Sequence, residues 1–145
     1  MKSVLAPFGA IVLLAAGSRA GDIVINDVAD AAETLTLNAG NTIRVNGLAT
    51  GAKMDLTSAD LAIAASGRLG EATHTNEITL RNTGQGPLKL GDNIASAASG
   101  YAISQAEFAN IRSGGDLTIR ANQALLVGDL AVAAQAGTVP GQIGE

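Results

Sequence analysis

Residues 23–26, Ile-Val-Ile-Asn, recur one repeat later as residues 43–46, Ile-Arg-Val-Asn, and this pair decides the fold. In both, apolar residues flank a middle residue, which is the period of a β-strand with one buried face. Asn closes each triplet, and Asn suits a corner because it tolerates left-handed backbone and can bond its own turn. We therefore predict that Asn26 and Asn46 stack at equivalent corners of neighbouring coils.

Similar triplets continue along the chain, and alternate ones start at nearly constant intervals. The intervals are 20 residues from Ile23 to Ile43, 19 from Leu35 to Met54 and 18 from Ile43 to Leu61. A nearly constant period of this size is typical of stacked coils. The predicted strands are residues 23–25, 35–37, 43–45, 54–56, 61–63, 78–80, 88–90, 117–119 and 130–132.

These strands predict an all-β chain, a parallel β-helix (β-solenoid) of roughly six coils with a rise of about 4.8 Å per coil. The composition agrees, because 47% of residues are hydrophobic but only 2% are aromatic, and small aliphatic side chains suit a narrow coil. An antiparallel sandwich is the alternative, since it also has short strands and frequent turns. The steadier spacing of alternate strands favours the solenoid.

One segment departs from the repeat. Ser104 stands three residues before Glu107, which is the capping-box arrangement of a helix start, and Gly114-Gly115 follows. We predict one short helical insertion of one or two turns where the chain rounds a corner. The residues expected to cover the adjoining core are Tyr101, Ile103, Phe108 and Ile111.

The first twenty residues have two interpretations. Lys2, an apolar run over residues 4–16 and small residues before Gly21 are the features of an export signal. The run is also compatible with a first strand. We therefore expect residues 1–20 to be a signal peptide or the first strand, and residues 21–145 to be a single β-helix repeat domain.

The composition provides little material for chemistry. The chain has no Cys and one His, which argues against thiol chemistry and against a histidine-based zinc site. The net charge of −4 and a pI of about 4.8 argue against a nucleic-acid partner. We assign no catalytic, cofactor-binding or metal-binding residue and expect no cofactor.

Three groups of residues were weighed as sites. His74, beside Glu77, has no nucleophile placed to help it, so a solvated loop histidine is favoured. Gly84-Gln85-Gly86 lacks the Lys and the helix of a phosphate loop. The acids that could approach one another across coils, as calcium ligands do, are Asp22, Asp27, Asp30, Asp55 and Asp60, and they match no calcium motif.

Residues 100–111, Gly-Tyr-Ala-Ile-Ser-Gln-Ala-Glu-Phe-Ala-Asn-Ile, followed by a Gly-rich turn and Asp-Leu-Thr-Ile at 116–119, resemble a known segment. It recurs in filamentous-haemagglutinin-like adhesins, the large two-partner-secreted exoproteins of Gram-negative bacteria. The likeness is closest over residues 78–133 and rests on composition and triplets over 22–77. It implies a right-handed parallel β-helix, an extended shaft at the cell surface, and a role in adhesion or in carrying a toxic tip.

The chain departs from that family in two ways, because it is much shorter and shows no amino-terminal secretion module. It therefore resembles a piece of the shaft. We expect a non-catalytic, secreted or cell-surface structural and adhesive module, with host-cell glycans or proteins, neighbouring β-helix coils or its own copies as partners. The alternative is a small secreted β-helix enzyme acting on polysaccharide.

Overall fold

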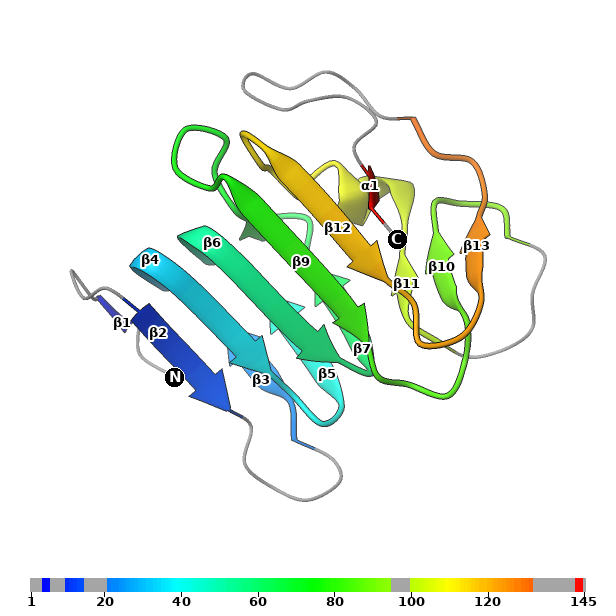
Figure 1. Ribbon diagram of the computed structural model, residues 1–145, viewed down its shortest axis with the longest axis horizontal. Coiled ribbons are helices and arrows are strands. Elements are labelled where there is room, and N and C mark those ends of the chain that lie inside the picture. The colour runs from blue at the N-terminus through cyan, green and yellow to red at the C-terminus, as the bar shows by residue number, and fades with distance from the viewer. Residues whose placement is uncertain (1–3, 6–9, 15–20, 95–99, 132–142, 145) are drawn as a thin grey trace.

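The computed structural model describes residues 4–5, 10–14, 21–94, 100–131 and 143–144. These residues form parallel sheets that stack as a β-solenoid of about 3 turns (Figure 1). The predicted all-β solenoid with a short helical insertion is confirmed. The predicted number of coils, roughly six, is wrong.

The strands fall into three parallel sheets. The largest follows the order β1-β4-β6-β9-β12-β14, with β2 beside β4 and β8 beside β6. Its strands are β1 (Val4–Leu5), β2 (Ala10–Leu14), β4 (Val28–Asn38), β6 (Leu48–Ser58), β8 (Arg68–Leu69), β9 (Glu77–Asn82), β12 (Asp116–Arg120) and β14 (Ile143–Gly144). The second sheet is β3 (Ile23–Ile25), β5 (Thr42–Val45) and β7 (Asp60–Ile63), and the third is β11 (Ala102–Ile103), β10 (Leu88–Leu90) and β13 (Leu125–Val127).

The register of the first coils is the one that the sequence spacing predicts. Ile23 pairs with Ile43, and Ile43 in turn pairs with Leu61. In the large sheet Leu35 pairs with Met54. The intervals of 20, 18 and 19 residues are therefore true rung-to-rung distances along the chain.

Later coils are longer, and this explains why there are fewer of them. Met54 pairs with Ile78, an interval of 24 residues, and Ile78 pairs with Leu117, an interval of 39. The extra chain includes β10, β11 and the helix α1 (Gln105–Phe108). Counting coils from a constant period overestimated their number because insertions lengthen a rung without adding one to the large sheet.

A bend divides the long strands β4 and β6 into two halves. Their pairing shifts between Ala31 and Thr34, where β4 carries one residue more than β6. The first halves continue into β1 and β8, and the second halves continue into β2 and β9. Together with the β3-β5-β7 sheet, each coil therefore has three sides around one interior.

The interior consists of apolar columns that run from rung to rung. Leu35, Met54 and Ile78 lie in one column, and every one of them is fully buried. Each such side chain contributes about 1.5–3 kcal/mol by burial. The next column, two residues further along the same strands, consists of Leu37, Leu56, Leu80 and Ile119.

The inserted segment places β11 out of chain order. β11 pairs with β10 on the edge opposite to β13. Its other side faces β7, where the Asp60 carboxylate accepts a hydrogen bond from the Ala102 amide at 3.2 Å. The second and third sheets are thus neighbours, joined here through a carboxylate.

The helix α1 confirms the predicted capping box. The Ser104 hydroxyl accepts from the Glu107 amide at 3.2 Å, and the Glu107 carboxylate accepts from the Ser104 amide at 2.9 Å. The four residues expected over the core do lie there, Tyr101, Ile103 and Ile111 buried and Phe108 partly buried.

One predicted strand is wrong. Leu130 and Ala131 belong to no strand, and residue 132 lies outside the described residues. The strand in this region is β13, whose Leu-Leu-Val sequence lacks the apolar-polar alternation that the search relied on. Its residues are set by stacking on β10, with Leu125 paired to Leu88.

The amino-terminal strands β1 and β2 pair in parallel with β4, at Val4 with Ala29 and at Ala10 with Thr34. Other residues among the first twenty lie outside the described residues. Whether residues 1–20 are removed stays a prediction, as does the single domain of residues 21–145.

Candidate functional site

A groove follows the corner between the β3-β5-β7 sheet and the first halves of the long strands. It has a volume of about 320 Å³, at the lower end of the range for small-ligand pockets. Three successive corners form the groove. Each corner is a pair of residues, the first of them polar, that directly precedes a strand of the large sheet. These corners are Asn26-Asp27 before Val28, Asn46-Gly47 before Leu48, and Ser66-Gly67 before Arg68.

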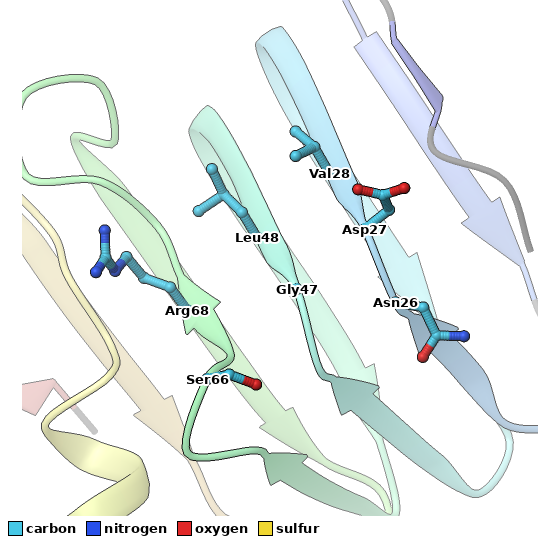
Figure 2. A pocket seen from close by; sticks show the side chains of 7 residues that line it. All are labelled: Asn26, Asp27, Val28, Gly47, Leu48, Ser66 and Arg68. Carbon is cyan, nitrogen blue, oxygen red and sulfur yellow. The ribbon is translucent and has the colours of Figure 1, made fainter.

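Gly47 forms the floor of the groove. A Cβ atom at this position would lie 2.0 Å from the Asp27 carbonyl oxygen, so no other residue fits without moving backbone. The backbones of the two coils therefore approach closely at this corner. Figure 2 shows Gly47 between Asp27 and Arg68, with Ser66 at the adjacent corner.

One wall of the groove is polar, and the predicted asparagine stack lies along it. Asn46 donates from Nδ2 to Oδ1 of Asn26 at 2.8 Å, which confirms that prediction. The Ser66 hydroxyl continues the column by donating to the Asn46 carbonyl oxygen at 3.3 Å. The opposite wall is aliphatic, because Val28 and Leu48 are half-buried there.

Two opposite charges lie at the ends of the groove without meeting. Asp27 and Arg68 are both exposed, and within the described residues neither side chain has an ion pair or hydrogen bond. Their backbones are two rungs apart, about 10 Å along the stack. Among the described residues, therefore, nothing occupies either charge.

Other charges near this corner are already engaged. The Asp22 carboxylate accepts from the Thr42 amide at 3.1 Å and from Asn41 Nδ2 at 2.8 Å. These bonds, the Thr42 bond first, hold the pKa of Asp22 below its usual value, and Arg44 at 3.5 Å adds to the effect. Asp22 and Arg44 thus belong to the rung-to-rung scaffold.

His74 has a structural contact. Its Nε2 lies 3.2 Å from the Ala31 carbonyl oxygen and 3.6 Å from Asp30 Oδ1. Ala31 lies beside the register shift of β4, so the ring reaches from the loop before β9 to the bend of that strand. The prediction of a solvated loop residue needs this correction: the ring is half-buried and contacts the scaffold.

Four of the five acids considered as calcium ligands contact separate partners, and the Asp27 side chain has no hydrogen bond or ion pair within the described residues. Asp30 faces His74, and Asp55 lies 3.5 Å from Arg81. Asp60 accepts from the Ala102 and Leu61 amides. Within the described residues, no three His, Asp or Glu side chains gather as a metal site would require.

The turn at residues 84–86 is held by two asparagines. Asn82 accepts from the Gly84 amide at 2.7 Å and donates to the Gly86 carbonyl oxygen, while Asn122 donates to the Gly84 carbonyl oxygen. The Gly84 amide, a group that a phosphate cradle would direct outward, is used inside the turn. The rejection of a phosphate loop here agrees with this bonding.

A second cluster of ionisable groups joins β7 to the inserted segment. Glu107 accepts from the Ile63 amide at 3.0 Å, and Asp60 accepts from the Ala102 amide. Burial raises the pKa of Asp60 above its usual value, and nearby Glu107 adds to the rise. Burial also raises the pKa of the Tyr101 phenol, whose hydroxyl faces Ser58 without the geometry of a hydrogen bond. This cluster is a structural seam.

The sequence search missed Arg68 and considered Asp27 only as a calcium ligand. The signal was present in the corner tripeptides, because Asn26-Asp27-Val28, Asn46-Gly47-Leu48 and Ser66-Gly67-Arg68 align at the 20-residue period. Aligning them places Gly47 between an acid and a base that have no partner within the described part of the chain. The arrangement can bind a ligand by charge and shape.

No helix among the described residues has the length and apolarity to cross a bilayer. No family model, curated protein or solved structure matches this chain.

Proposed function

We propose that the chain is a non-catalytic structural and adhesive solenoid module, a segment of the shaft of a large filamentous surface adhesin from a Gram-negative bacterium. The observation that carries the proposal is the use of charged side chains as ties between neighbouring rungs. Lys53 of β6 lies 3.1 Å from Glu77 of β9, and Arg81 of β9 lies 3.5 Å from Asp55 of β6. Charged side chains that pair with one another between rungs favour a structural role over a catalytic one.

The outer surface of the large sheet has the same character. Its middle positions carry Thr36, Asp55, Thr79 and Thr118 in register from β4 to β12. Thr79 is buried and the other three are half-buried, so this row of short polar side chains gives the sheet a flat face. A flat, polar face fits a module that spaces or presents a contact surface.

The exposed ends of the solenoid indicate the proposed partner. It is a second copy of this chain or further coils of the parent adhesin. Leu125 and Val127 of β13 are 39% and 60% exposed although their register partners Leu88 and Leu90 are fully buried. β13 is the last strand of its sheet, and within the described residues β3 at the other end also has an unpaired edge. An exposed apolar edge strand is a template for another strand.

The matching of these ends favours a second copy stacked head to tail. β3 and β13 are both three-residue apolar strands, and both pair in parallel with their inner neighbours. Parallel addition of β3 of one copy to β13 of another would continue the ladder. The double variant Leu125→Lys, Val127→Lys should therefore lower the mass measured by light scattering, and an unchanged mass would contradict this stacking.

The enzyme alternative predicts a different outcome in one experiment. Host-type polysaccharides are immobilised, the folded chain is applied, and both bound chain and released reducing ends are measured. An adhesive module gives bound chain that a heat-unfolded sample lacks, with no new reducing ends. Release of reducing ends would support the enzyme instead, and neither signal on any surface would overturn both.

A further inference from the structure

We infer that the corner groove binds a glycan bearing a carboxylate, with its acid group on Arg68 and its hydroxyl groups on Asp27. This inference rests on the proposed adhesive function and assigns it a site. The groove is independent of the exposed edge of β13, since its lining residues come from the corners before β4, β6 and β8.

Arg68 fixes one end of the ligand. A guanidinium presents a planar fork of donors that matches a carboxylate in a bidentate manner. Its own backbone is held in place, because the Arg68 amide donates to the Gly47 carbonyl oxygen at 2.8 Å. With no partner for its side chain in the described chain, Arg68 is available to an anion from solution.

Asp27 fixes the chemistry of the other end. An ionised carboxylate only accepts hydrogen bonds, so its ligand must bring donors, and adjacent sugar hydroxyls do so. The Asp27 carbonyl oxygen already accepts from the Leu48 amide at 2.8 Å, which holds the backbone beneath the side chain. The backbones that carry the two charges are two rungs apart, about 10 Å, and two linked sugar rings cover at least that span.

The middle of the groove suits a sugar ring. Ser66 lines the groove beside Gly47 and offers a hydroxyl on one side. Val28 and Leu48 offer aliphatic surface to the C–H face of a ring on the other. One cation within a chain of net charge −4 argues for an isolated carboxylate and against a densely sulfated chain.

The test uses the full chain, with backbone amide shifts of Gly47 and Arg68 followed by NMR. The probes are a disaccharide with one uronate, its neutral methyl ester, and a tripeptide with a basic and an acidic side chain. We expect the uronate to shift the groove amides and to bind at least about tenfold more tightly than the ester, because only the acid pairs with Arg68. Stronger binding of the tripeptide than of the uronate would overturn the glycan assignment.

The variants are Arg68→Gln and Asp27→Asn, with Arg120→Gln and Asp116→Asn as matched controls on the exposed face of β12. Arg68→Gln should weaken the uronate about tenfold and abolish the preference over the ester, while both controls bind as wild type does. Equal binding by Arg68→Gln would overturn the groove assignment. If that variant also still adheres to immobilised polysaccharide, the proposed function stands and only the groove fails.

Discussion

The Asn46 side chain donates a hydrogen bond to the Asn26 side chain at 2.8 Å, one rung above it. The contact joins residues 20 positions apart at the same corner. It makes the two coils keep one register, because a shift of one residue would separate the amides and turn apolar side chains outward. The same corner carries the groove, so register and binding surface depend on one another.

Asn46→Ala should lower the free energy of unfolding by about 0.5–1 kcal/mol, since an exposed hydrogen bond between side chains is lost. Asn38→Ala is the matched control, because Asn38 is exposed at the end of β4 and its side chain makes no hydrogen bond within the described chain. Urea unfolding of both variants measures the difference. Equal effects would show that the stack contributes nothing.

Gly47→Ala should destabilise the chain by about 3 kcal/mol or more, because the added methyl group collides with backbone and the coils must separate. Gly84→Ala is the control, since the nearest atoms to its added Cβ lie 3.1 Å away. Thermal unfolding followed by circular dichroism compares the two. A Gly47 variant as stable as the Gly84 variant would argue against the close approach of coils at the corner.

Glu107→Ala should cost more than Ser104→Ala. The serine substitution removes a helix cap, worth about 1 kcal/mol. The glutamate substitution removes the reciprocal capping bond and also leaves the Ile63 amide without its acceptor, so about 2 kcal/mol is expected. If denaturant unfolding ranks the two variants the other way, the seam between β7 and the inserted segment is not held as described.

The substitutions Asp60→Asn and Asp22→Asn should change the pH dependence of the free energy of unfolding with opposite signs. The pKa of Asp60 is raised, so the stability linked to its proton is full below its unfolded value, about 4, and is lost as pH rises through the raised pKa. The pKa of Asp22 is lowered, so its contribution is present above about 4 and is lost as pH falls through the lowered pKa.

As pH rises from about 3 to about 7, the free energy of unfolding of Asp60→Asn should therefore increase relative to that of wild type. That of Asp22→Asn should decrease relative to wild type over the same range. Urea midpoints of the three proteins at both pH values provide the comparison. Parallel pH profiles for wild type and either variant would contradict the assigned environment of that carboxylate.

The first coils could be predicted from the sequence because a two-residue alternation and a corner residue recur at a regular interval. The spacing from Ile23 to Ile43 contains no insertion, so counting residues was equivalent to counting rungs. The helix cap at Ser104 could be predicted equally well, since it depends on two residues three positions apart in the sequence. These features are local or strictly periodic.

The rest depended on contacts that the sequence does not space regularly. β13 is a strand because β10 lies beside it, although its residues do not alternate. Arg68 keeps the 20-residue spacing after Leu48, but its strand β8 has only two residues and so no apolar triplet to mark it. The placement of β11 between β7 and β10 follows from the chain returning along an insertion of variable length.

The central claim, adhesion by the folded solenoid, is tested most directly by bead retention on cultured cell layers under flow. Beads carry either the wild-type chain or the same chain unfolded by heat, at equal surface density. The account predicts that folded-chain beads are retained and that unfolded-chain beads wash away. Equal retention of the two kinds of bead would contradict it.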